Sequence, residues 1–113
     1  QTVTAQYDGS IWLVLGDMSE LGPEAEALHA AAGREARALG FQRLYALGPL
    51  SAHAAEAFGT NAACFDNHDA LIRALADALQ KGVRVLVKGS RSAQMERVVT
   101  ALSDSADAGG QSC

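Results

Sequence analysis

The 113-residue sequence has little of several features that mark particular classes of protein. It holds two cysteines and two prolines, and aromatic residues make up only 5% of the chain. Cys64 and Cys113 form no Cys-x-x-Cys spacing, which argues against a disulfide scaffold and against a structural zinc site. Two free thiols suit a reducing compartment, so we expect a cytoplasmic protein.

Long apolar runs and an excess of basic residues are also missing. Without a run of about 18 apolar residues, the sequence predicts no membrane-spanning segment. Residues 1–10 contain neither a basic region nor an apolar core, so they do not resemble a secretory signal. Nine Lys and Arg residues against thirteen Asp and Glu residues give a net charge of −4. This balance argues against general binding to nucleic acid, which requires many phosphates to be neutralised.

Short apolar runs alternate with longer segments of helical period. The runs predict strands at 11–15, 44–47, 62–65 and 83–87. The other segments predict helices at 23–39 and 51–58, a third that begins after Asp66 or Asn67 and ends at Lys81-Gly82, and a fourth that carries Met95, Val98, Val99 and Leu102. We interpret 1–10 as a disordered or linker segment, 11–102 as one domain and 103–113 as a disordered tail.

This alternation predicts the α/β fold class, with a Rossmann-like open parallel sheet and helices on both faces. The first and fourth strands have the most apolar runs and are expected to be the most buried. A strand order of 3-2-1-4 places them side by side and creates a switch point, where open sheets bind ligands beyond the carboxyl ends of the strands. An acidic segment, 16–20, and a basic segment, 88–91, leave those two ends.

Several side chains within the predicted elements have bland structural interpretations. Leu28, Ala32, Ala36 and Leu39 recur at helical spacing and predict the buried stripe of the first helix. His29 lies beside that stripe, which favours a hydrogen-bonded, partly buried imidazole over a catalytic base. The remaining expectations are a helix cap at Ser51, a core position for Cys64, solvated imidazoles at His53 and His68, and cap residues rather than a metal site at 66–69.

The basic segment Lys88-Gly89-Ser90-Arg91 is the strongest candidate for binding a ligand. Gly89 lets a ligand approach the backbone closely, Ser90 offers a hydroxyl, and Arg91 presents a planar fork suited to a carboxylate. The alternative is that Ser90 only caps the next helix while the two cations are solvated. In the acidic segment, Asp17 and Glu20 either orient a substrate ammonium or a bound cation, or belong to a solvated loop. Neither a phosphate-binding loop nor a dinucleotide fingerprint occurs.

Two paired motifs extend this interpretation through a family resemblance. The sequence from 11 to 102 resembles the C-terminal domain of the Mur ligases. The residues that carry the resemblance are Gly16-Asp17-Met18-Ser19-Glu20-Leu21-Gly22, Leu28-His29, Gly33, Leu47-Gly48, Lys88-Gly89-Ser90-Arg91 and Met95-Glu96.

The resemblance implies one domain of an ATP- and Mg²⁺-dependent amide ligase of peptidoglycan biosynthesis, which joins D-Ala-D-Ala to UDP-MurNAc-tripeptide. Lys88, Gly89, Ser90 and Arg91 would hold the carboxylate of D-Ala-D-Ala or line its pocket. Asp17, Met18 and Glu20 would face the closed site, near the amine or the nucleotide. The domain's partners would be the central ATPase domain and the N-terminal UDP-binding domain of the same chain, with neither nucleic acid nor membrane involved.

The sequence also departs from the family pattern, because residues 1–10 contain no phosphate-binding loop and no Asn-rich segment. We therefore expect an excised domain that is inactive by itself and contains no catalytic residue or metal ligand of its own. Two alternatives remain open from the residues. One is a freestanding α/β module that binds a small anion, and the other is the same domain from a Mur ligase or folylpolyglutamate-type ligase with another amino substrate.

Overall fold

The computed structural model describes residues 11–78, 83–89 and 93–101. A short helical stretch at 96–101 follows the last strand, and none of the described helices is long and apolar enough to cross a bilayer. The predicted linker at 1–10 and the predicted tail at 103–113 lie outside the described residues. The elements in chain order are β1 (Ile11–Gly16), the 3-10 helix η1 (Ser19–Glu24), α1 (Ala25–Ala38), β2 (Arg43–Leu47), α2 (Ser51–Phe58), β3 (Ala62–Phe65), α3 (His68–Ala78) and β4 (Arg84–Lys88).

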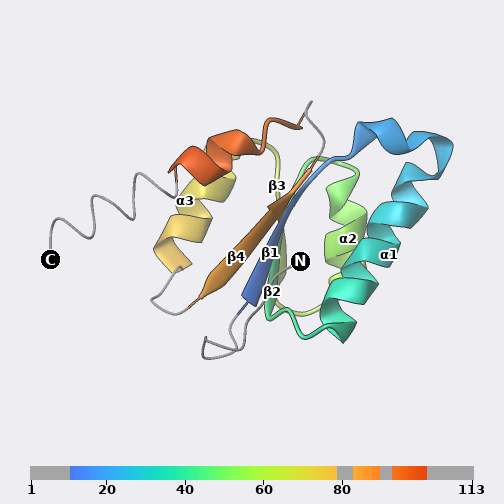
Figure 1. Ribbon diagram of the computed structural model, residues 1–113, viewed down its shortest axis with the longest axis horizontal. Helices are drawn as coiled ribbons and strands as arrows, with labels where there is room; N and C mark the ends of the chain where they lie inside the picture. Colours follow the sequence, from blue (N-terminus) through green and yellow to red (C-terminus); the bar gives the residue numbers. More distant parts are fainter. Residues whose placement is uncertain (1–10, 79–82, 90–92, 102–113) are drawn as a thin grey trace, which may run out of the picture.

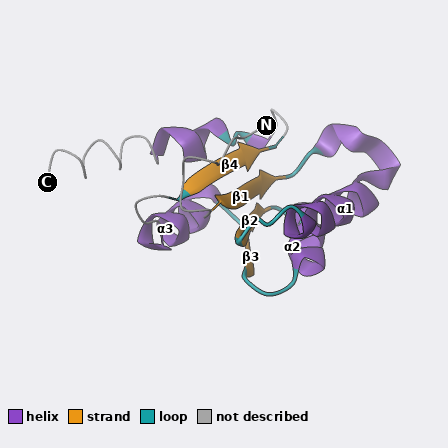
Figure 2. Ribbon diagram, turned by 60° about the horizontal axis from the view of Figure 1, so that its bottom comes forward, coloured by secondary structure: helices purple, strands orange, loops and turns teal. Residues whose placement is uncertain are grey.

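The described strands form one parallel sheet in the order β3-β2-β1-β4, which confirms the predicted topology. β1 lies between two neighbours, so that Leu13 pairs with Leu44 on β2 and with Leu86 on β4. α1 and α2 cover one face of the sheet, and α3 with the 96–101 stretch covers the other (Figure 1). The view in Figure 2 shows the same three layers. The predicted α/β fold with helices on both faces is therefore confirmed.

Alternate side chains of β1 contribute to two separate cores. Trp12 and Val14 belong to the cluster that α3 covers, whereas Leu13 and Leu15 belong to the cluster that α1 and α2 cover. Successive side chains of a strand point to opposite faces of the sheet. A strand covered on both faces therefore needs the continuous apolar run that occurs at 11–15.

The burial of the strands follows their position in the sheet. All six residues of β1 are buried, and so are four of the five residues in β2. β4 was predicted to be one of the two most buried strands, and this is wrong: its residues are half-buried or exposed, because it lies at the edge of the described sheet. Cys64 is exposed rather than part of the core, because β3 lies at the opposite edge.

The first helical segment also differs from the prediction. A single helix was expected at 23–39, but α1 begins at Ala25, and Pro23 lies in η1. The predicted buried stripe is wrong as well, since Leu28 is 43% exposed and Leu39 is 68% exposed. The residues of α1 that are buried are Ala25, His29, Gly33 and Ala36.

Close packing between α1 and α2 explains which face of α1 is buried. A Cβ atom added at Gly33 would fall against the carbonyl oxygen of Ala54 on α2. The two helices therefore approach through small residues, and the leucines of α1 lie outside this contact. This arrangement places the N-terminus of α2 beside the carboxyl end of β1, where the loop after β1 contacts it.

Candidate functional site

The carboxyl ends of β1 and β4 lie side by side, as the strand order predicted. Leu15 pairs with Lys88, so the segments that leave the two strands begin next to each other. A Cβ atom added at Gly89 would lie 3.3 Å from Cα of Gly16 and 2.6 Å from Cγ of Met95. Glycine at 89 thus permits a close contact between the two backbones, with the Met95 side chain packed against them. The structure therefore brings the beginning of the acidic segment and the first two residues of the basic segment together at one crevice.

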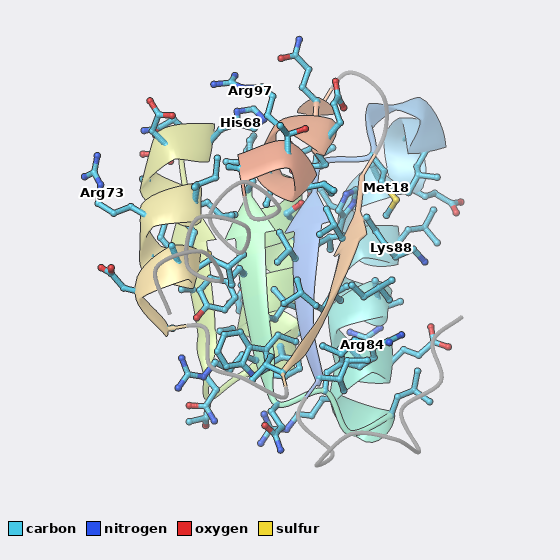
Figure 3. The ribbon with its side chains drawn as sticks, turned by 60° about the vertical axis from the view of Figure 1, so that its left-hand side comes forward. Met18, His68, Arg73, Arg84, Lys88 and Arg97 are labelled. Carbon is cyan, nitrogen blue, oxygen red and sulfur yellow. The ribbon has the colours of Figure 1, made fainter. Side chains whose placement is uncertain are left out.

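Two cavities flank this crevice. The first has a volume of about 450 Å³ and lies between α1 and the sheet, with apolar walls that include Leu15 and Leu86. The second has a volume of about 550 Å³ and lies between the end of β4 and the residues that follow, including Met95 and Glu96. Met18 and Lys88 line both cavities. Figure 3 shows these two side chains on the same side of the sheet.

Lys88 places a cation at the crevice. It is the last residue of β4 and is exposed to solvent. Among the described residues, its ammonium group has neither a hydrogen-bond partner nor an ion-pair partner. An unpaired ammonium beside a cavity is suited to binding a carboxylate or another anion.

Asp17 has a defined contact on the other side of the crevice. Its Oδ1 accepts a hydrogen bond from the backbone N–H of Ser51 at 2.7 Å, and its Oδ2 accepts one from that of Leu50 at 3.1 Å. Gly48, with φ of +107°, packs so closely that an added Cβ would lie 2.6 Å from Cγ of Asp17. The carboxylate therefore caps α2 from a distant part of the chain. Its expected role near an amine or a nucleotide stays a prediction.

Ser51 was predicted to cap α2 with its own side chain, and the structure contradicts this. The Ser51 hydroxyl is buried and has no hydrogen-bond partner among the described residues. Asp17 performs the capping instead, because the loop after β1 brings its carboxylate to the first amides of the helix.

His29 on α1 contacts the loop after β1, and His68 on α3 contacts the segment that follows β4. His29 is hydrogen-bonded, as the sequence predicted, but it is fully rather than partly buried. Its Nε2 accepts a hydrogen bond from the backbone N–H of Met18 at 3.0 Å. His68 was expected to be solvated, but its Nε2 donates to the carbonyl oxygen of Ala93 at 2.8 Å. Arg97 donates to Nδ1 of His68 at 3.4 Å. The prediction for His68 is wrong because the start of α3 packs against the segment that follows β4.

The remaining predicted site residues have no described side chain. Ser90 and Arg91 lie outside the described residues. Glu20 lies in η1, but its side chain is not among those that the structure describes. Across the described ranges, no group of three or more His, Cys, Asp and Glu side chains converges as a metal site would require.

Comparisons with known proteins agree with the fold and with the family resemblance. The family model described as Mur ligase, glutamate ligase domain, matches residues 1–91. The UDP-N-acetylmuramoyl-tripeptide--D-alanyl-D-alanine ligase of Escherichia coli (strain K12) is 42% identical over 90% of this chain and 23% of its own length. The ligase of the same name from Synechocystis sp. (strain ATCC 27184 / PCC 6803 / Kazusa) is 37% identical over 79% of this chain and 20% of its own length.

Two solved structures share the fold. MurF from Acinetobacter baumannii superimposes with a TM-score of 0.73 and 27% identity, over 82% of this chain and 22% of that one. The fold also matches MurF ligase from Thermotoga maritima in complex with ADP, with a TM-score of 0.70 and 24% identity, over 87% of this chain and 22% of that one. The chain thus spans about a fifth of the length of the relatives it matches. By sequence and by fold, it belongs to the Mur ligase family and corresponds to the C-terminal, glutamate ligase domain of these enzymes.

Proposed function

We propose that this chain is the substrate-delivery domain of an ATP-dependent ligase that adds D-Ala-D-Ala to UDP-MurNAc-tripeptide in the cytoplasm. The observation that carries the proposal is the 42% identity, across 90% of the chain, with a ligase of that name. The crevice at the ends of β1 and β4 supports it. Lys88, a cation without a partner among the described residues, lies there beside two cavities and can pair with the carboxylate of a small dipeptide.

In this proposal, the described residues bind and orient the incoming dipeptide. The Lys88 ammonium pairs with the dipeptide carboxylate, and Gly89 allows the ends of β1 and β4 to lie in close contact beside it. Met18 forms the facing wall, and Asp17 keeps α2 attached to the loop that carries Met18. From the family resemblance, Ser90 would add a hydroxyl and Arg91 would add a second cation.

ATP and Mg²⁺ are assigned to other parts of the ligase. The described residues do not fit a magnesium site, because they hold no cluster of carboxylates and because Asp17 already accepts two backbone hydrogen bonds. We place both cofactors on the central ATPase domain and the nucleotide-linked tripeptide on the N-terminal domain. The present domain would close over them, present the dipeptide amine and exclude water. The isolated chain would then bind D-Ala-D-Ala weakly and ligate nothing.

Steady-state kinetics of the intact ligase that carries this domain test the proposal. The substrates are ATP, UDP-MurNAc-tripeptide and D-Ala-D-Ala, and the readout is phosphate release. We expect Lys88→Met to raise KM for the dipeptide by about tenfold or more, because loss of a charge-assisted hydrogen bond weakens binding by about that factor. KM for ATP should stay unchanged. Arg73→Met is the matched control, because Arg73 is an exposed cation on α3 that points away from the crevice (Figure 3).

The other outcomes separate the alternative functions. Ligation of glutamate or a diamino acid in place of D-Ala-D-Ala would identify a ligase with another amino substrate. Failure to ligate any amino component would favour a module that only binds anions. If Lys88→Met and Arg73→Met behave alike, Lys88 does not hold the dipeptide.

A further inference from the structure

His29 is a fully buried titratable group that the proposed reaction does not use. Its ring lies between two backbone groups. Nδ1 lies 2.6 Å from the carbonyl oxygen of Ala25, one turn earlier in α1. Nε2 lies 3.0 Å from the backbone nitrogen of Met18, in the loop after β1.

These two partners determine the protonation of the ring. A carbonyl oxygen can only accept, so Nδ1 of His29 must carry a hydrogen. A backbone N–H can only donate, so Nε2 must offer its lone pair to Met18. The arrangement requires a neutral imidazole in the Nδ1–H form. A second proton on Nε2 would remove the acceptor for the Met18 N–H.

The loop that His29 holds is the one that shapes the crevice. Met18 and Lys88 are the two residues that line both cavities. Between β1 and Met18, the carboxylate of Asp17 is bound to the first amides of α2. The loop is therefore fastened twice, to α1 through His29 and to α2 through Asp17. The contact with His29 holds the backbone N–H of Met18, which forms the wall, and the carbonyl oxygen of Met18 accepts a hydrogen bond from the backbone N–H of Leu21 at 3.4 Å.

We infer that His29 is a positioning residue. Its neutral imidazole holds the backbone of Met18, and this places the Met18 side chain at the two cavities that it lines together with Lys88, where the amino substrate would bind. The consequence for the substrate rests on the proposed function. The hydrogen bond and its effect on the loop do not, so they are tested separately on the 113-residue chain.

The wild-type chain provides the first test, without any substitution. In ¹⁵N-labelled protein, we expect a long-range ¹H–¹⁵N spectrum to show His29 in the Nδ1–H form. We also expect a scalar coupling across the hydrogen bond between the Met18 amide nitrogen and Nε2 of His29. A hydrogen on Nε2, or a protonated ring at neutral pH, would overturn the inference.

Two variants separate the bond to Met18 from the general effect of altering a buried side chain. The amide of His29→Gln reaches the position of Nε2 and can still accept from Met18, whereas the shorter His29→Asn can serve only Ala25. We expect hydrogen exchange of the Met18 amide to become about tenfold faster in His29→Asn and to stay near the wild-type rate in His29→Gln. His53→Gln is the control, because His53 is half-exposed on α2 and approaches Glu26 instead. Equal Met18 exchange in His29→Asn and wild type would refute the positioning role.

Kinetics of the intact ligase provide the last test. We expect His29→Asn to raise KM for D-Ala-D-Ala more than KM for ATP, and His29→Gln to restore most of the loss. A similar rise in both constants would indicate a general loss of structure and contradict the inference. If the wild-type ligase does not use D-Ala-D-Ala, the proposed function fails, and the two measurements on the chain still decide the role of His29. Should His29→Asn not fold, the wild-type spectra decide it alone.

Discussion

Asp17 and Ser51 are 34 positions apart in the chain, yet Oδ1 of Asp17 lies 2.7 Å from the backbone nitrogen of Ser51. A carboxylate at the end of one strand thus caps a helix that follows the next strand. The first amides of a helix lack partners within the helix and lie at the positive end of its dipole, so a carboxylate is well suited to them. The contact attaches one wall of the crevice to the body of the domain.

This capping contact predicts a loss of stability in Asp17→Ala. We expect the free energy of unfolding to fall by about 1–3 kcal/mol, because the variant removes a charged acceptor from two amides. Asp17→Asn keeps one acceptor oxygen and should lose less. Urea denaturation followed by circular dichroism measures the change, with Asp77→Ala on the exposed face of α3 as the control. Equal stability of Asp17→Ala and Asp77→Ala would contradict the capping role.

The packing of α1 on α2 predicts that Gly33→Ala is destabilising. Alanine favours a helix over glycine by about 1 kcal/mol, so an unpacked helix would gain stability. Here the added methyl group meets the carbonyl oxygen of Ala54, and overpacking of this kind costs about 1–3 kcal/mol or more. We expect a net loss in thermal and urea denaturation, whereas Arg34→Ala on the exposed face of the same helix should be nearly neutral. A more stable Gly33→Ala would refute the close approach.

The difference between the predicted and the observed buried face of α1 shows what helical periodicity in a sequence does not reveal. The predicted stripe and the buried set have the same helical spacing and share Ala36, but His29 and Gly33 are buried instead of the preceding residues, Leu28 and Ala32. Periodicity favours the larger apolar side chains, here Leu28 and Leu39. Helices that approach closely need small side chains instead, and this requirement depends on a partner helix that a linear pattern does not reveal.

The strand order and the crevice could be predicted because they follow from general rules of parallel sheets. Alternating elements determine the layers, and two strong apolar runs identify the neighbouring strands around the switch point. The contacts that hold the loops could not be predicted this way. The bond from Met18 to His29 joins residues 11 positions apart, and that from His68 to Ala93 joins residues 25 positions apart. Neither spacing belongs to a repeating pattern.

The contact between His68 and Ala93 predicts that His68→Ala loosens the segment after β4. The variant removes the donor to the Ala93 carbonyl and the acceptor for Arg97. We expect the amides of Val98 and Val99 to exchange about tenfold faster with deuterium, whereas the amides of α1 keep their rates. His53→Ala is the matched control on α2. Unchanged exchange at 93–101 would show that His68 does not hold this segment.

Arg91 follows Lys88 and Gly89 in the basic motif and provides a prediction that rests on the proposed function. A guanidinium can form two parallel hydrogen bonds to a carboxylate, whereas a lysine ammonium at the same position keeps the charge and loses the paired geometry. In the intact ligase, we expect Arg91→Ala to raise KM for D-Ala-D-Ala by about tenfold or more, and Arg91→Lys to be intermediate. KM for ATP should change little in either variant. Initial-rate measurements with each substrate varied in turn test this prediction. Loss of a cation that holds the carboxylate must weaken binding of the dipeptide. An unchanged KM for the dipeptide in Arg91→Ala would therefore show that Arg91 does not bind it.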